Sequence, residues 1–240
     1  KTTTAAALLA SLHRRGARVL GVDLDPQGSL GFSLGLDIER CLTVYEVFRG
    51  EVEPQQAIAH TDSGDILPSN ILLSGAELEF NRPGREFLLK TALSKVEQNY
   101  DYIIIDTQPT RDSQILSNAI AAADYVLIPM QCDAFSEDSA FRTYSICSKL
   151  SKDPASRLKG IGVVLTMVDK GAATRETREE CKSELGSALF EAEIPMALAV
   201  KSSVRKCVPV CYSARTQPVG RSYAALYKEL KERLDKLEEN

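Results

Sequence analysis

Two clusters of side chains near the start of the sequence suit phosphate and magnesium chemistry. The first is Lys1-Thr2, which opens a helical pattern. In a phosphate-binding loop, a lysine reaches the terminal phosphates, the next hydroxyl holds Mg²⁺, and the dipole of the following helix favours the phosphate. The glycines that open such a loop are absent from the sequence. The dipeptide therefore gains weight only from residues further along the chain.

The second cluster consists of two carboxylates, Asp23 and Asp25, in the string Val-Asp-Leu-Asp-Pro-Gln-Gly at 22–28. Side chains two residues apart on a strand share a face. Both carboxylates can therefore point into the crevice where open α/β sheets bind ligands. Pro26 would end the strand pairing, and Gly28 would free the turn. The alternative interpretation is two acids in a solvated turn.

A third acid, Asp106, directly follows the apolar run 102–105, Tyr-Ile-Ile-Ile. A carboxylate at the end of a buried strand is costly unless it is solvated or paired. In a nucleotide site, a hydrated Mg²⁺ is its natural partner. The pattern is common by itself, but after the first two clusters it favours a nucleotide site.

The elements that would position these residues alternate between helix and strand. Residues 2–15 have apolar side chains at helical spacing, with Gly16 as a cap, and lead into an apolar run at 18–24. Later apolar runs are nearly continuous, as in parallel strands covered on both faces; they lie at 102–105, 125–129 and 161–165. Further helices are expected at about 84–99, 112–123, 136–151, 175–190 and 223–237.

This alternation predicts an α/β fold with a doubly wound, mostly parallel sheet. Neither loop-like stretch, at 171–174 or 213–220, separates two self-sufficient cores. We therefore expect a single domain over residues 1–240.

Composition indicates a folded protein of the cytoplasm. The 240 residues are 44% hydrophobic and 26% charged, with a net charge of −4, so the chain as a whole is not a polyanion binder. No run reaches the ~18 apolar residues of a membrane span, and the start lacks a signal pattern. The six cysteines form no Cys-x-x-Cys pair, so we expect free thiols and no zinc, with Cys207 and Cys211 in a strand or loop.

The chemical residues belong to longer strings that resemble the ParA/Soj group of deviant Walker A ATPases, relatives of MinD. The most discriminating strings are Asp-Leu-Asp-Pro-Gln-Gly at 23–28 and Leu-Pro-Ser-Asn at 67–70, the latter followed by Ser-Gly-Ala-Glu-Leu-Glu at 74–79. Other matching pieces run through most of the chain, at 1–4, 18–20, 73, 100–106, 109 and 128–132.

The resemblance implies an ATPase with a P-loop NTPase-like fold that uses ATP and Mg²⁺. It makes Lys1 the phosphate lysine, Thr2 the hydroxyl that holds Mg²⁺, and Thr3 a phosphate contact. The family's loop reads Lys-Gly-Gly-x-Gly-Lys-Thr, and its first lysine reaches the phosphates of the partner in the ATP-bound dimer. Because that lysine, the glycines and the first, central strand are missing here, we expect the chain as written to bind nucleotide poorly or not at all.

The same resemblance implies roles for the three acids. Asp25 orients the attacking water, Asp23 is its catalytic neighbour in the same loop, and Asp106 holds a water bound to Mg²⁺. In the family, the segment after Asp106 acts as a switch, and relatives usually carry two prolines there. Gln108, Arg111 and Asp112 depart from that pattern and would change the coupling of this segment to the γ-phosphate, so the sequence leaves the hydrolysis rate open.

A basic segment lies near the end of the chain. Between residues 196 and 233, eight cations stand against two acids, which suits nonspecific contact with DNA phosphates. Arg205 and Lys206, expected in a loop, are the preferred contacts, together with Lys201. The alternative is an ordinary solvated surface whose charges pair with acids elsewhere.

The resemblance implies a cytoplasmic, nucleoid-associated protein of plasmid or chromosome segregation. ATP would drive formation of a homodimer that binds nonspecific DNA, and a ParB-like partner would stimulate hydrolysis and release. One alternative is a non-catalytic scaffold with this fold. Another is a membrane-associated positioning ATPase like MinD, which the acidic end of the last helix disfavours because anionic lipid would repel it.

Overall fold

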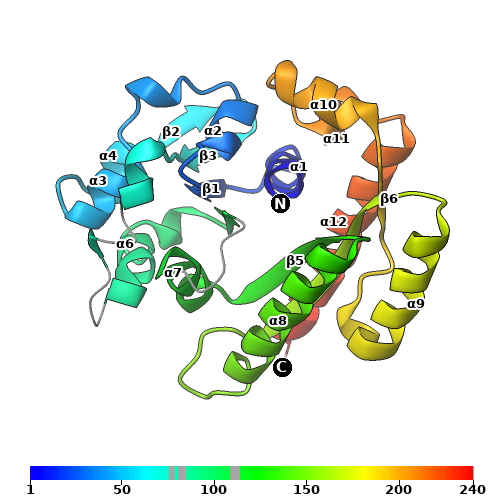
Figure 1. Ribbon diagram of the computed structural model, residues 1–240. Helices are drawn as coiled ribbons and strands as arrows, with labels where there is room; N and C mark the ends of the chain where they lie inside the picture. The colour runs from blue at the N-terminus through cyan, green and yellow to red at the C-terminus, as the bar shows by residue number, and fades with distance from the viewer. Residues whose placement is uncertain (76–78, 81–84, 109–113, 240) are drawn as a thin grey trace. The chain divides into compact units, whose positions relative to one another are not determined.

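The computed structural model describes residues 1–75, 79–80, 85–108 and 114–239 (Figure 1). These residues form two compact units. Unit 1 comprises Lys1–Ala122 and Ser202–Val210, and unit 2 comprises Ala123–Lys201 and the chain from Cys211 onward. The expectation of a single domain over 1–240 stays a prediction.

Unit 1 is built on a four-stranded sheet with the order β2-β3-β1-β4. β1 (Val19–Leu24) pairs in parallel with β3 (Gly64–Leu67) on one side and with β4 (Tyr102–Thr107) on the other. β2 (Ala59–Thr61) is antiparallel to β3 and forms a hairpin with it. The carboxyl ends of β1, β3 and β4 therefore meet at one edge of this sheet.

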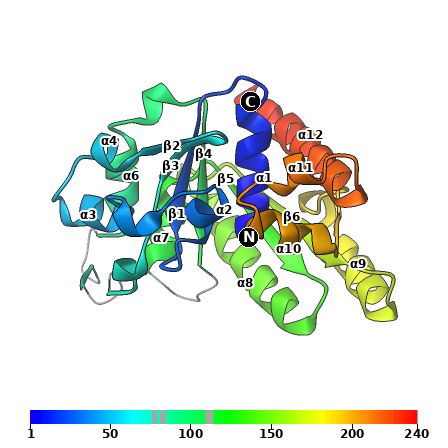
Figure 2. The same ribbon diagram turned by 90° about the horizontal axis from the view of Figure 1, so that it is seen from above.

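Helices cover both faces of the sheet in unit 1, as Figure 2 shows. α1 (Thr2–His13) lies against one face, where Gly21 of β1 allows a close approach: a Cβ at Gly21 would lie 2.5 Å from Cδ1 of Leu9. The other face of β1 packs against three helices through Leu20, Val22 and Leu24. These helices are α3 (Val44–Arg49), α6 (Leu88–Leu93) and α7 (Gln114–Ala122).

Short elements complete unit 1. The loop after β1 leads into α2 (Ser29–Ser33), and a capping box in which Thr43 and Glu46 bond each other's backbone amides starts α3. The remaining short elements are α4 (Pro54–Ala57) and the 3₁₀ turns η1 (Ile38–Arg40), η2 (Ile71–Gly75), η3 (Arg85–Phe87) and η4 (Glu97–Asn99).

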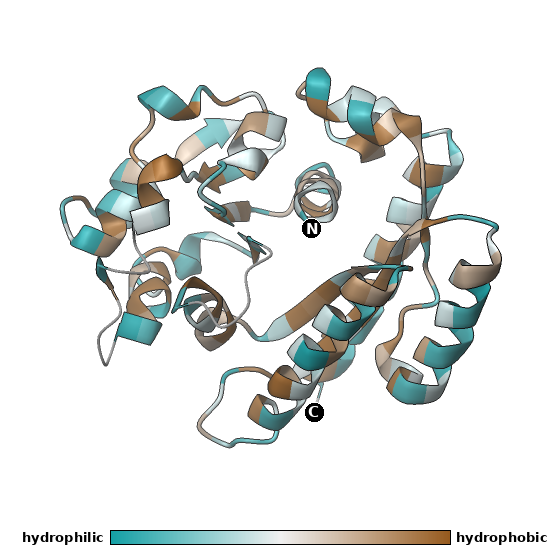
Figure 3. Ribbon diagram, in the orientation of Figure 1, coloured by the Kyte–Doolittle hydropathy of each residue, from teal (hydrophilic) through white to brown (hydrophobic). Residues whose placement is uncertain are grey.

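Unit 2 contains a three-stranded parallel sheet with the order β5-β6-β7. Its strands are β5 (Tyr125–Gln131), β6 (Gly160–Val168) and β7 (Ile194–Pro195). β5 is coloured brown in Figure 3 and is mostly half-buried, whereas teal covers much of α9, as expected for a surface helix. The helices around this sheet are α8 (Ala134–Leu150), α9 (Ala172–Leu185), η5 (Gly186–Ala188), α11 (Val210–Ser213) and α12 (Pro218–Glu238).

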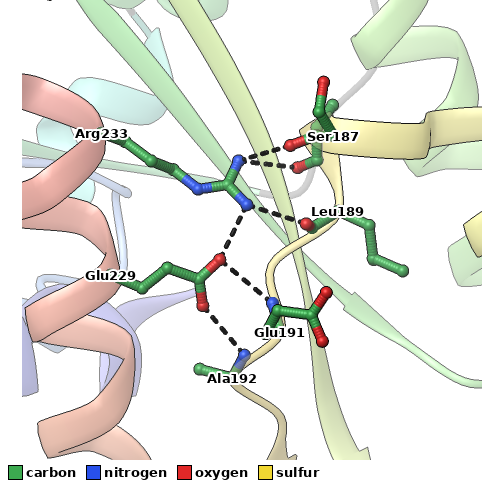
Figure 4. A network of polar contacts seen from close by, with 7 residues as sticks. Ser187, Leu189, Glu191, Ala192, Glu229 and Arg233 are labelled. Carbon is green, nitrogen blue, oxygen red and sulfur yellow. Dashed lines mark hydrogen bonds and ion pairs between the residues drawn. The ribbon is translucent and has the colours of Figure 1, made fainter. Parts of the chain in front are cut away.

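A polar network ties α12 to the loop before β7 (Figure 4). Arg233 donates to the carbonyl oxygens of Ser187 and Leu189, each at 2.8 Å, and forms an ion pair with Glu229 at 2.7 Å. The carboxylate of Glu229 accepts hydrogen bonds from the backbone amides of 191 and 192 at 3.1 and 3.0 Å. These bonds satisfy backbone amides and carbonyl groups of the loop.

The α/β class and the predicted strands are confirmed, and most of the predicted helices are found. The helix expected at about 84–99 is found only in part: α6 covers six residues of it, and the 3₁₀ turns η3 and η4 lie on either side. Cys211 lies in the short helix α11, not in a strand or loop, whereas Cys207 follows α10 (Leu198–Arg205) in a turn. All six cysteines are free thiols. No cluster of potential metal ligands of the His, Cys, Asp or Glu type occurs among the described residues, and no described helix is long and apolar enough to span a membrane.

Candidate nucleotide site

The amino end of α1 brings Lys1 and Thr2 to the sheet of unit 1. Lys1 caps the helix, and its carbonyl oxygen accepts hydrogen bonds from the amides of Thr4 at 2.8 Å and Ala5 at 3.0 Å. Thr2 and Thr3 are half-buried in the first turn, and the side chain of Thr2 hydrogen-bonds Asp106. The first turn of α1 therefore meets the carboxyl end of β4.

Asp106 is only 3% exposed, and its Oδ2 atom has no hydrogen-bond partner among the residues that the structure describes. Burial raises the pKa of this carboxyl group, and the hydrogen bond from Thr2 opposes the shift. A buried carboxylate oxygen without a partner is costly. A carboxylate oxygen beside a threonine hydroxyl is the kind of oxygen donor set that Mg²⁺ and its bound waters take. The residues present therefore fit a hydrated magnesium ion.

Asp23 is fully buried, and its carboxylate bonds backbone amides of the following loop and of the first turn of α2. Its Oδ1 accepts from the amide of Asp25 at 3.0 Å, and its Oδ2 accepts from the amides of Leu30 at 2.9 Å and Gly31 at 3.3 Å. Burial raises the pKa of Asp23 to about 7, although these hydrogen bonds favour the charged form. The carboxylate thus shapes the loop, and Asp23 does not lie in a solvated turn.

Asp25 stands at the start of this loop and is half-buried. Its Oδ1 accepts from the amide of Gln27 at 2.9 Å, and its carbonyl oxygen accepts from the amide of Gly28 at 2.9 Å. Lys1 is exposed overall, but partial desolvation lowers the pKa of its ammonium group, and the carboxylates of Asp106 and Asp25 oppose that shift. One cation and two acids therefore share this edge of the sheet.

The segment after β3, at 68–70, packs against the loop at 25–28, a contact that the sequence did not reveal. Gly28 has a left-handed backbone with a φ of +61°, and a Cβ there would lie 2.8 Å from the carbonyl oxygen of Ser69. The carbonyl oxygen of Pro68 accepts from the amide of Val44 at 2.9 Å, which fixes this segment to α3. The string at 67–70 thus packs against the string at 23–28. The sequence marked both strings as the most discriminating parts of the family resemblance, but it did not show that they are in contact.

Comparison with known proteins decides the family. A protein-family model described as an AAA domain matches residues 1–159. The chromosome partitioning protein ParA of Myxococcus xanthus is 34% identical over 238 residues, covering 97% of this chain and 84% of that protein. The chain belongs to the ParA/Soj family. The sporulation initiation inhibitor protein Soj of Bacillus subtilis is 37% identical over 204 residues, covering 81% of this chain and 79% of Soj.

A solved relative of this ParA/Soj family chain holds a nucleotide. The structure titled cobyrinic acid a,c-diamide synthase from Mycobacterium smegmatis has a bound ATP analog and magnesium. It is 34% identical, with a TM-score of 0.72, and covers 86% of each chain. It supports the fold assigned to the family, a P-loop NTPase type with mostly parallel strands.

In the basic segment of this ParA/Soj family member, some cations are exposed without an ion pair and others are bonded to neighbouring groups. Lys201, Arg205 and Lys206 are exposed, and in the described parts of the chain none of them forms an ion pair. Arg205 is the last residue of α10 and does not lie in the expected loop, whereas Lys206 follows in a turn. The other kind is held by acids or carbonyl groups of unit 2: Lys228, Lys231 and Arg233.

The segment after Asp106, which the resemblance identifies as a switch, lies only in part within the described residues. Gln108 follows β4 and is half-buried. Arg111 and Asp112 lie outside the described residues. Their effect on hydrolysis in this ParA/Soj family chain stays a prediction.

Proposed function

We propose that this protein is a ParA-type partition ATPase, which binds ATP with Mg²⁺ and hydrolyses it at the carboxyl edge of the sheet in unit 1. The observation that carries the proposal is the unpartnered Oδ2 of Asp106, buried beside the hydroxyl of Thr2 at the start of a helix. A structural carboxylate would satisfy both of its oxygens, as Asp23 does. Membership of the ParA/Soj family and the nucleotide and magnesium of the solved relative support the same chemistry.

Each residue of the site has a distinct part in this proposal. A bound Mg²⁺ would neutralise phosphate charge. Thr2 would hold the ion directly, and Asp106 would hold it through water. Lys1 and Thr3 would contact phosphate oxygens, and Asp25 would orient the attacking water. Phosphoryl transfer needs mainly positioning and charge neutralisation, so this small set can suffice.

Asp23 acts differently from the other two acids. Its Oδ1 bonds the amide of Asp25 in the loop, and its Oδ2 bonds the amides of Leu30 and Gly31 in the first turn of α2. We therefore assign it to positioning: it fixes the backbone on which Asp25 stands and need not touch the nucleotide. This refines the catalytic role that the resemblance implies for Asp23.

The proposed cycle couples the site to DNA. ATP binding would favour a homodimer whose Arg205, Lys206 and Lys201 contact DNA phosphates without reading sequence. A ParB-like DNA-binding protein would stimulate hydrolysis and so release the dimer from DNA. The protein would then work in the cytoplasm on the nucleoid, in plasmid or chromosome segregation.

DNA retention under different nucleotides tests this function. The protein, expressed from its complete reading frame, is passed over immobilised nonspecific DNA with Mg²⁺ and ATP or ADP. The proposal expects retention with ATP and loss with ADP. Equal retention with both nucleotides would contradict the proposed switch and favour a non-catalytic scaffold. Sedimentation with anionic liposomes is the control for a MinD-like role, and ATP-dependent binding there would favour that role instead.

A further inference from the structure

A second buried polar atom without a partner lies at the same sheet edge as Asp106. Among the described residues, Oγ of Ser69 and Oδ2 of Asp106 are the two buried side-chain oxygen or nitrogen atoms that lack a hydrogen-bond partner. Ser69 is fully buried. Such groups are rare in folded proteins, and each one calls for a physical reason.

The fold places Ser69 away from Asp106. Ser69 follows β3, Asp106 belongs to β4, and β1 lies between these two strands. Leu67, two residues before Ser69, is the register partner of Val22. The hydroxyl of Ser69 is therefore close to the end of β1 and to the loop that follows, so the magnesium chemistry proposed for Asp106 does not account for it.

The loop that carries Asp25 lies against Ser69. The carbonyl oxygen of Ser69 lies 2.8 Å from the position of a Cβ on Gly28, so the two backbones touch. Ser69 itself is fixed from the other side, because the adjacent Pro68 carbonyl accepts the amide of Val44. The hydroxyl thus sits on a rigid segment next to the turn formed by residues 25–28.

We propose that Ser69 is a positioning residue for Asp25: its hydroxyl bonds the backbone of the 25–28 turn when that turn takes its hydrolytic arrangement. This inference rests on the proposed ATPase function. Hydrogen bonds in catalytic sites often form well only in the complex with substrate, and a small misplacement of a catalytic group is enough to slow a reaction strongly. The hydroxyl of Ser69 then lacks a partner in the present arrangement because its acceptor comes within reach only in the hydrolytic arrangement of the turn.

The test combines turnover and stability in Ser69→Ala. Removing an unpartnered buried hydroxyl leaves the melting temperature unchanged or raises it. If Ser69 positions Asp25, kcat falls by about tenfold or more while KM for ATP stays nearly constant. Amide hydrogen exchange adds a readout independent of activity: ATP with Mg²⁺ protects residues 27–31 in the wild type and protects them less in Ser69→Ala.

Ser33→Ala is the matched control. Ser33 is also buried, but its hydroxyl has a partner and donates to the carbonyl oxygen of Leu30 at 2.8 Å. This substitution should lower the melting temperature and change kcat little. An unchanged kcat and unchanged protection in Ser69→Ala, in a wild-type background that hydrolyses ATP, would overturn the inference alone. If the wild type itself fails to hydrolyse ATP, the proposed function fails first, and this inference fails with it.

Discussion

Asp23 and Asp106 are register partners on the neighbouring parallel strands β1 and β4, and both are buried. Their surroundings nevertheless differ. Backbone amides bond both oxygens of Asp23, whereas Asp106 keeps Oδ2 without a partner beside Thr2. Two identical side chains at one level of the sheet thus separate into a carboxylate that shapes the loop and a carboxylate available to a cation.

This difference predicts that the same substitution, aspartate to asparagine, affects mainly stability at one position and mainly Mg²⁺-dependent ATP binding at the other. Asp23→Asn replaces an acceptor oxygen with a donor that faces backbone amides, and it should lower the free energy of unfolding by about 1–3 kcal/mol. Asp106→Asn can keep its oxygen toward Thr2, so the fold should change less, but Mg²⁺-dependent binding of ATP should be lost. Urea denaturation measures the first effect, and calorimetric titration with ATP, with and without Mg²⁺, measures the second. Equal destabilisation with unchanged magnesium dependence would contradict the assignment.

Stability should depend on pH through Asp23. Burial raises its pKa from an ordinary value of 3.8 to about 7, so the folded state holds the proton more tightly than the unfolded chain. The Asp23 contribution to stability is therefore greatest below about pH 4, falls as the pH rises to about 7, and stays level above that. Unfolding free energies at pH 5, 6, 7 and 8 should show this decline in the wild type. Asp23→Asn should make this decline shallower without abolishing it, because the pKa of the buried Asp106 is also raised and acts in the same direction. An identical slope in the variant would refute the role of Asp23.

Gly28→Ala should damage the loop more than the backbone conformation alone explains. A Cβ at Gly28 meets the side chain of Ile38 and the carbonyl oxygen of Ser69, in addition to the cost of a left-handed alanine. Gly50 provides a matched control, because its φ is +73° and no atom lies within 4 Å of its Cβ position. Gly50→Ala should cost about 1 kcal/mol of unfolding free energy. Gly28→Ala should cost more and also slow ATP turnover, whereas equal costs would show that the contact with Ser69 is unimportant.

Some cations of the basic segment should contribute to DNA binding, and others should not. Arg205→Ala with Lys206→Ala should weaken ATP-dependent DNA binding and reduce the slope of log K against log salt by about 2, one for each lost phosphate contact. Arg233→Ala should leave that slope unchanged, because Arg233 bonds three carbonyl groups of unit 2, pairs with Glu229 and stacks on Phe190. It should instead lower stability by about 2 kcal/mol. An unchanged slope in the double variant would remove Arg205 and Lys206 from the interface.

The sequence predicted the regular parts of this fold because long apolar runs and helical spacing report burial directly. The strands around Val22 and Val163, both fully buried, are examples. It did not predict the β2-β3 hairpin, whose strands are three and four residues long. It also did not predict the breaks that divide 84–99 into the short helix α6 and two 3₁₀ turns. Elements of this size have too few residues for a periodic signal, and tertiary contacts decide them.

For the site, the sequence predicted which residues take part but not how the backbone around them is arranged. Unit 1 contains Lys1 and Thr2 at the start of a helix, and Asp23, Asp25 and Asp106 at the ends of strands, as the sequence predicted. The separate task of Asp23 and the support from Ser69 depend on which backbone amides and carbonyl groups lie nearby. The internal use of Arg233 likewise follows from the position of α12 beside its loop. No count of charges along the sequence contains that information.

The most direct measurement is ATP turnover by the protein expressed from its complete reading frame, compared between the wild type and Asp25→Ala with Mg²⁺ and nonspecific DNA present. The proposal predicts measurable turnover in the wild type, and in Asp25→Ala it predicts that turnover is lost while ATP is still bound. Turnover that is equal in both proteins, or absent from a wild type that binds ATP and Mg²⁺, would contradict a ParA-type hydrolytic site at this edge of the sheet.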